Sequence, residues 1–140
     1  MKIKKEIYSQ IINRCPVVPP EVGGIIGMKN GVVSVVEFDF LNIIHDFAQY
    51  IPDTESINKT IRLWDKKGFD FCGMFHSHMY NQKTLSNEDK RYIEEIMCLM
   101  PEKTEALYFP VIMPKQKIIS YKAEKKNHSI LILNDIIEIV

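Results

Sequence analysis

The sequence predicts an α/β fold in which helices sandwich a mixed β-sheet. Apolar runs typical of strands alternate along the chain with segments whose apolar residues recur at helical spacing. Between two of the apolar runs lies Asn30-Gly31, a pair that supplies the positive φ angles of a tight hairpin turn. The length of 140 residues suits one domain. We therefore expect a single domain over residues 1–140.

The first part of the chain predicts a helix followed by a hairpin. The helix is indicated by isoleucines on one face, at Ile3, Ile7, Ile11 and Ile12. The Cys15-Pro16 pair would end it, because the residue before a proline is pushed out of helical geometry. Residues 22–28 form the first strand of the hairpin, and the return strand runs from Val32 to about Leu41.

The rest of the chain predicts two more helices and a set of strands. Residues 42–52 look irregular, and Asp53 or Thr54 would then cap a helix that ends at Gly68. The nearly continuous apolar run Phe69–Phe75 indicates a central strand covered on both faces. Ser86 would open the next helix, which ends before Pro101. Strands or strand-like pieces close the chain at residues 107–113, 118–123 and 129–140.

Composition excludes several classes of protein. Lys and Arg total 18 and so do Asp and Glu, so no excess positive charge favours nucleic-acid binding. The three cysteines, Cys15, Cys72 and Cys98, contain no CxxC pair, which excludes a disulfide framework and a four-cysteine zinc site. The amino terminus lacks the apolar core of a signal peptide, and the apolar stretches are far shorter than the roughly 20 residues that span a bilayer. We expect a cytoplasmic protein with no membrane or nucleic-acid partner.

Two histidines at the end of the predicted central strand form a candidate metal site. His76 and His78 are two residues apart, so their side chains point the same way, with Cα atoms about 6.6 Å apart. Imidazoles at that separation can converge on one zinc ion. Asp89 is a candidate third ligand: with Ser86 as the N-cap it lies in the first helical turn, where the helix dipole favours its ionised form. Such a set leaves a fourth position for water, as in catalytic zinc sites.

This pattern resembles the JAMM (MPN-plus) metalloprotease family. The resemblance rests on His76-x-His78, seven residues, Ser86, two residues and Asp89, preceded by Glu21-Val-Gly-Gly-Ile-Ile-Gly27. It implies a compact, prokaryotic-type member with JAB/MPN (cytidine-deaminase-like) architecture. It also implies His76, His78 and Asp89 as Zn²⁺ ligands, Glu21 as general base, and Ser86 as a hydrogen-bonding helper to the oxyanion. The glycines after Glu21 fit a strand whose backbone closely approaches another chain or a substrate.

Simpler interpretations of the same residues remain open. Ser86 could be an ordinary helix cap, because Ser-x-x-Asp is close to a capping box. Glu37 is the alternative general base, although it lies inside the return strand. Cys72, four residues before His76, would share the face of that histidine, but a cysteine in this apolar run is better explained as a buried residue.

The resemblance implies a zinc-dependent peptidase or isopeptidase. Its substrate would be a protein or peptide, such as the extended carboxyl-terminal tail of a ubiquitin-like or sulfur-carrier protein, bound by strand addition at a sheet edge. The alternative is a non-catalytic MPN scaffold. A zinc nucleobase deaminase is disfavoured, because that chemistry expects H-x-E and a distant P-C-x-x-C. The oligomeric state stays open, although the apolar residues Ile130–Val140 could pair with a second copy.

Overall fold

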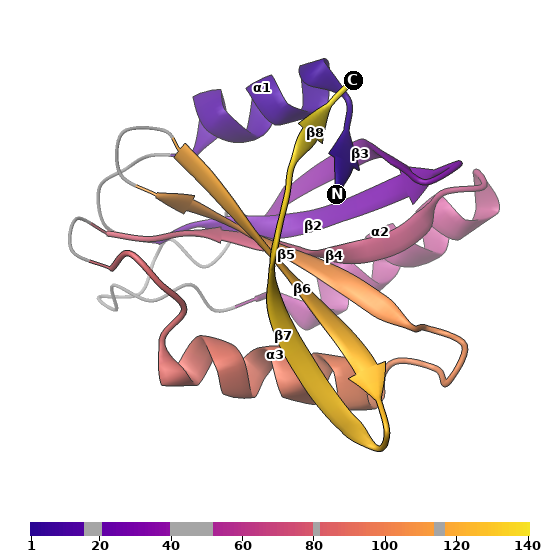
Figure 1. The fold of residues 1–140 in the computed structure, drawn as a ribbon. Helices are drawn as coiled ribbons and strands as arrows, with labels where there is room; N and C mark the ends of the chain where they lie inside the picture. The colour runs from indigo at the N-terminus through magenta and orange to yellow at the C-terminus, as the bar shows by residue number, and fades with distance from the viewer. Residues whose placement is uncertain (16–20, 40–51, 80–81, 114–116) are drawn as a thin grey trace.

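The computed structural model describes residues 1–15, 21–39, 52–79, 82–113 and 117–140, and it shows a curled mixed β-sheet with helices on both faces (Figure 1). The helices are α1 (Lys5–Arg14), α2 (Thr54–Lys66) and α3 (Asn87–Leu99). The strands are β1 (Lys2–Ile3), β2 (Gly23–Lys29), β3 (Val32–Asp39), β4 (Asp70–Ser77), β5 (Ala106–Met113), β6 (Lys117–Lys126), β7 (Ser129–Asp135) and β8 (Glu138–Ile139).

The sheet has the strand order β7-β6-β5-β4-β2-β3-β1-β8. Strand β4 lies in the middle, antiparallel to β2 and parallel to β5. The short strand β1 pairs in parallel with β3 on one side and with β8 on the other. The predicted α/β class, with helices sandwiching a mixed sheet, is confirmed.

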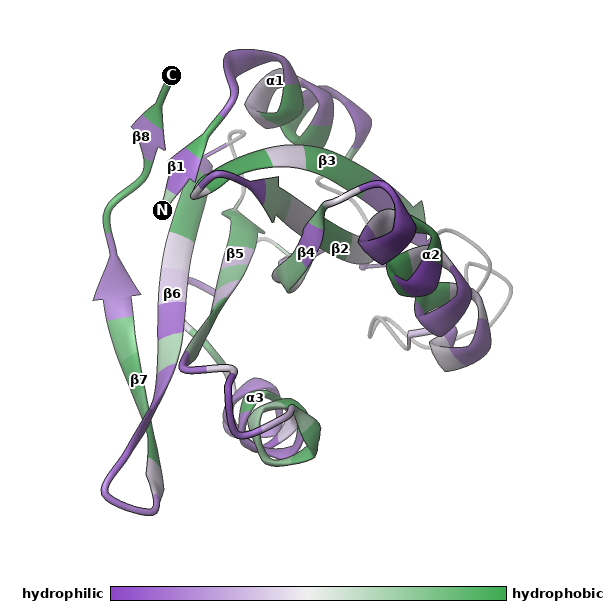
Figure 2. Cartoon of the chain, turned by 90° about the vertical axis from the view of Figure 1, so that its right-hand side faces the viewer, coloured by the Kyte–Doolittle hydropathy of each residue, from purple (hydrophilic) through white to green (hydrophobic). Residues whose placement is uncertain are grey.

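Each face of the sheet packs its own apolar cluster. Helix α1 covers one face, where Ile7 and Ile11 pack with Ile26 and Phe75 from the sheet. Helices α2 and α3 cover the other face (Figure 2). Trp64 and Met97 are buried there. The purely apolar side chains of the central strands therefore go to two different layers. Among the described residues, no helix is long and apolar enough to cross a bilayer.

Local sequence signals account for most element boundaries. Asn30 and Gly31 have φ angles of 53° and 75°, as the predicted hairpin requires. The side chain of Asp53 accepts a hydrogen bond from the amide of Ser56 and caps α2, and Gly68, with φ 73°, follows its end. Helix α3 begins after Ser86 and ends at Leu99, before Pro101.

One helix boundary was predicted wrongly. Ile3 belongs to strand β1 and not to the first helix, which begins at Lys5. Ile3 is opposite Val33 of β3 in the sheet, so strand pairing overrides the helical spacing. It still packs in the same apolar cluster as Ile7 and Ile11, which explains why the three residues share an apparent pattern. The predicted end of the return strand at Leu41 and most of the predicted irregular segment 42–52 lie outside the described residues.

A β-bulge in the middle of β4 changes which side chains share a face. Across β2, Ile26 pairs with Gly73 but Gly27 pairs with Phe71, so one extra residue lies in β4. Gly73 has φ 153°, and a Cβ there would lie 1.7 Å from the carbonyl oxygen of Tyr108 on β5. Only glycine fits this position. The bulge shifts the alternation of side chains along the strand just before the histidine pair.

Candidate metal centre

The candidate site lies where β4 leaves the middle of the sheet and α3 begins. His76 is in the last part of β4, and His78 follows its final residue, Ser77. Asp89 lies in the first turn of α3. The ring nitrogens of the two histidines approach to 2.9 Å (Nε2 to Nε2), so the side chains point the same way, as their spacing predicts.

The donor atoms of these three residues lie close together, within 4.8 Å of one another. His76 Nε2 lies 3.3 Å from Asp89 Oδ1, and His78 Nε2 lies 3.3 Å from Asp89 Oδ2. With Zn–N and Zn–O bonds of about 2.0–2.1 Å, the edge of a regular tetrahedron is about 3.3–3.4 Å, which the two distances to Asp89 match, whereas the two histidine nitrogens, at 2.9 Å, are closer than that edge. Two imidazole nitrogens and one carboxylate are also a donor set that zinc accepts. These three residues could therefore hold a metal ion.

The Gln82 carbonyl sets the tautomer of the neutral His78 ring, while nearby acidic groups favour the protonated ring. Its side chain is buried, and its Nδ1 lies 3.1 Å from the carbonyl oxygen of Gln82. A carbonyl only accepts, so Nδ1 donates, and in the neutral ring the lone pair is then on Nε2, which faces Asp89. Burial lowers the pKa of His78, but the hydrogen bond and charge of Asp89, the Gln82 carbonyl and the charge of Glu21 outweigh it and raise that pKa. Without a metal the protonated ring is therefore favoured, and its Nε2–H donates to Asp89; a metal ion would replace that proton.

Asp89 is held as a carboxylate by its position at the start of the helix. Its Oδ2 accepts hydrogen bonds from the Ser86 amide (2.7 Å) and the Ser86 hydroxyl (2.8 Å), while its own amide donates to Ser86 Oγ (3.0 Å), completing a capping box. Burial alone would raise the pKa of Asp89, but the hydrogen bonds from His76, His78 and Ser86 hold it well below its usual range. The ionised form is the one that a metal requires.

Ser86 is the helix cap that the simpler interpretation expected. Its hydroxyl donates to Asp89 and accepts from the amide of the same residue. It is not among the residues that line the cavity beside His76. The structure therefore shows Ser86 orienting Asp89, and a second role toward an oxyanion stays a prediction.

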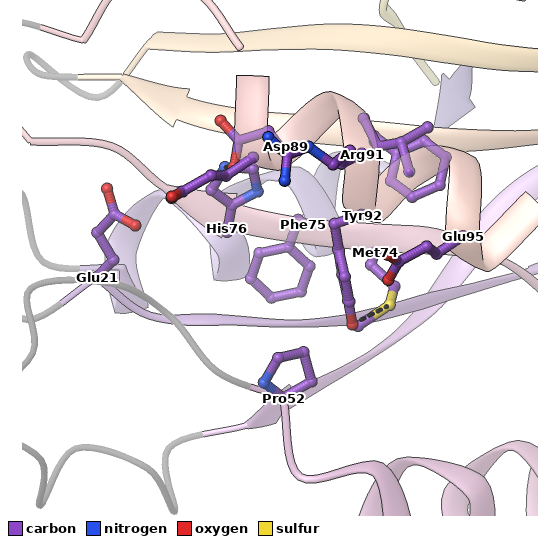
Figure 3. Close-up of a pocket in the computed structure, with 12 residues that line it drawn as sticks. Glu21, Pro52, Met74, Phe75, His76, Asp89, Arg91, Tyr92 and Glu95 are labelled. Atoms are coloured by element: carbon purple, nitrogen blue, oxygen red, sulfur yellow. Dashed lines mark hydrogen bonds and ion pairs between the residues drawn. The ribbon is translucent and has the colours of Figure 1, made fainter. Parts of the chain in front are cut away.

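Glu21 lies on the same side of the molecule as the three donor residues. It precedes β2, whose first residue, Gly23, pairs with His76. Glu21, His76 and Asp89 all line one cavity of about 370 Å³. Figure 3 shows these three residues toward one end of that cavity, with Tyr92, Met74 and Glu95 toward the other. Glu37, the alternative base, is exposed on β3 and lines a different cavity with Ile57 of α2.

The cavity is also lined by residues that were not predicted as site residues from the sequence. Glu88, Arg91, Tyr92 and Glu95 reach it from α3. Residues 88, 92 and 95 are spaced at four and three, so they share one face of the helix beside Asp89. That spacing is the signal that could have identified them. With Glu21 and Asp89, the acidic residues of this lining outnumber its one arginine.

Three further expectations about the site need correction. Cys72 does not share the face of His76: the bulge turns it into the α1-side cluster with Phe75, where its thiol contacts the carbonyl oxygen of Ile26. Burial, and then the charge of Asp70, raise the pKa of this thiol beyond its ordinary range, so Cys72 is not a candidate nucleophile.

The close approach at Gly24 is within the sheet, because a Cβ there would lie 2.1 Å from the Glu37 carbonyl oxygen. Strand β4, which carries His76, is not an edge strand that a substrate tail could join, because β2 and β5 flank it.

Comparison with known proteins identifies the fold. No protein family model matches the sequence, and no curated protein matches it significantly. Among solved structures, protein DSY2949 from Desulfitobacterium hafniense is similar over 99% of this chain and 93% of its own, with TM-score 0.67 and 20% identity. AF2198, a JAB1/MPN domain protein from Archaeoglobus fulgidus, is similar over 100% of this chain and 97% of its own, with TM-score 0.59 and 15% identity. The chain thus has the JAB/MPN fold, as the motif predicted.

Proposed function

We propose that this protein is a zinc-dependent peptidase or isopeptidase of the JAMM type. His76, His78 and Asp89 would hold the metal, and Glu21 would act as general base. The observation that carries the proposal is the convergence of the donor atoms of these three residues, all within 4.8 Å of one another, beside a cavity that Glu21 also lines. The JAB/MPN fold supports the same conclusion, because a JAB1/MPN domain protein is similar over the whole chain.

In this proposal each residue of the site has a separate role. Zinc, when bound, polarises water and the carbonyl of a scissile bond. Glu21 then takes the proton of the attacking water and passes it to the leaving amine. The carbonyl of Gln82 keeps the His78 ring in the metal-binding tautomer. Ser86 keeps Asp89 ionised and oriented.

A role for Ser86 toward the oxyanion requires its hydroxyl to turn away from Asp89. In the structure the hydroxyl proton is directed to Asp89 Oδ2. Loss of one oxyanion donor typically raises the barrier by about 2.7–4 kcal/mol. A Ser86→Ala variant with a smaller effect on turnover would limit this residue to the helix cap.

For the substrate, we propose an extended polypeptide tail, such as that of a ubiquitin-like or sulfur-carrier protein. Because β4 is paired on both sides, the tail would not be added as a neighbouring strand of β4. It would instead enter the cavity over the end of the strand, between Glu21 and α3.

The test combines metal analysis with cleavage of fusions to ubiquitin-like proteins. We expect the wild-type protein to bind one zinc ion and to cleave. Glu21→Gln should bind zinc as tightly as wild type but lose at least about 100-fold in turnover, since general-base catalysis contributes roughly 10²–10⁴-fold. Glu37→Gln is the matched control and should remain active.

Two outcomes would contradict the proposal in different ways. If Glu21→Gln cleaves as fast as wild type, Glu21 is not the base. If the wild-type protein binds zinc but cleaves no fusion or peptide, the non-catalytic scaffold replaces the peptidase.

A further inference from the structure

Ser77, the residue between the two histidines, makes an unusual contact at the end of the ladder between β2 and β4. Its amide donates to the carbonyl oxygen of Val22 at 2.8 Å, as in any antiparallel pair. The return bond is not made in the usual way: the amide of Val22 donates to the hydroxyl oxygen of Ser77, at 3.0 Å. The side chain of Ser77 thus acts as the acceptor where a main-chain carbonyl would serve in a regular ladder.

This contact lies at the end of the ladder between β2 and β4. The paired register between β2 and β4 ends at Gly23 and His76. Strand β4 is paired with β5 at the same point, where Ser77 is opposite Ile112, and the amide of His78 donates to the carbonyl oxygen of Ile112. The strand end that carries the histidines is therefore held by β5 on one side and by the contact of Ser77 with Val22 on the other.

The two hydrogen bonds of Ser77 also fix the main chain next to Glu21. Both reach Val22, the residue that directly follows Glu21 in the sequence. Ser77 and Val22 are both buried, so water cannot readily replace the hydroxyl as the acceptor. One side chain thus links the segment that carries the two histidines to the segment that carries the glutamate.

We infer that Ser77 is a positioning residue. Its hydroxyl fixes the position of Glu21 relative to the three candidate metal ligands, His76, His78 and Asp89. This inference rests on the proposed function, in which Glu21 is the base. It goes beyond that function because it assigns a task to a residue that neither binds the metal nor lines the cavity. Ser77 acts only through the main chain of Val22 and does not touch the substrate.

The test compares Ser77→Ala with Ser77→Thr and with a matched control, Ser120→Ala. Ser120 is also a buried serine in the sheet, and its hydroxyl donates to Asp135 Oδ2 at 3.0 Å, but it lies in β6, outside the site. Three quantities are measured for each variant: zinc affinity by calorimetry, amide hydrogen exchange at Val22 and Ile26, and the separate values of kcat and KM.

For Ser77→Ala we expect zinc affinity within about threefold of wild type, because the metal ligands remain. Exchange at the Val22 amide should be at least about tenfold faster, with Ile26 unchanged, because only the end of the ladder is released. The kcat should fall about 10–100-fold with little change in KM, as for other residues that orient a reacting group. Ser77→Thr retains the hydroxyl and should restore all three, and Ser120→Ala should alter none.

The inference is overturned if Val22 exchange is unchanged in Ser77→Ala, because the hydroxyl then does not hold that residue. It is also overturned if zinc affinity falls as far as kcat, or if Ser120→Ala loses as much turnover. Should the wild-type protein cleave nothing, the proposed function fails, and the exchange and zinc measurements alone decide whether Ser77 holds the Glu21 segment independently of the metal ligands.

Discussion

The two halves of β4 differ in what determines the place of each side chain. From Phe71 to Phe75 the strand is apolar, and its side chains go to clusters on opposite faces of the sheet. From His76 to His78 the side chains meet polar groups of α3, of Val22 and of the following loop. The apolar half depends on packing and a bulge, whereas the polar half depends on specific hydrogen bonds. Each half therefore responds to different substitutions.

The largest effect is expected in the polar half. Asp89→Asn keeps the size of the side chain and an oxygen for the helix cap but removes the negative charge. We expect zinc affinity to fall more than about 100-fold, beyond the range for residues that only support a ligand. The thermal stabilisation that zinc gives the wild-type protein should vanish with it. Calorimetric titration with zinc checks this, and Glu94→Gln, an exposed change on the same helix, is the control. Equal affinity in both variants would contradict the assignment of Asp89.

A change in the apolar half should affect stability. In Gly73→Ala the new Cβ would lie 1.7 Å from the carbonyl oxygen of Tyr108, so the strands must separate. We expect the free energy of unfolding to fall by about 3 kcal/mol or more in urea titrations of the zinc-free protein. Gly31→Ala is the control, because φ is +75° there but no atom lies within 4 Å. Its cost should be only about 1–2 kcal/mol. Similar losses in the two variants would show that the bulge does not need glycine.

The grouping of His76, His78 and Asp89 could be predicted from the sequence, because it depends on short spacings along the chain. The offsets between His76, His78, Ser86 and Asp89 span one strand end and one helix start, each with its own signal. Glu21 could be placed only through the family resemblance, since its approach depends on the pairing of β2 with β4. The fold class followed from the alternation of helices and strands.

The errors share one physical cause, which is that tertiary pairing overrides a local period. Ile3 joined a strand because Val33 was available as a partner. Cys72 was assigned to the face of His76 because perfect alternation was assumed, and a bulge breaks that alternation. The contact of Ser77 with Val22 has no signal in the sequence, because it joins residues 55 positions apart.

The smallest effects on stability and zinc binding are expected for the cysteines. Cys72, in the apolar half of β4, tests whether that half is separate from the metal site. Cys15 and Cys72 are buried and Cys98 is exposed. Burial raises the pKa of Cys15 to about 12 despite the nearby charge of Arg14. We expect a thiol reagent to label only Cys98 in the native protein, as mass spectrometry of the labelled peptides would show.

Cys72→Ala should cost about 1 kcal/mol of stability and leave zinc affinity unchanged. Labelling of Cys72 that zinc prevents would place this residue near the metal instead.

The central claim is that one metal ion is held by two imidazoles and a carboxylate at the end of β4. X-ray absorption at the zinc edge of the protein loaded with one equivalent of zinc tests it most directly. We predict a first shell of nitrogen and oxygen only, at about 2.0–2.1 Å, with the outer-shell scattering of two imidazole rings. A sulfur shell at about 2.3 Å, or the absence of imidazole scattering, would contradict the account.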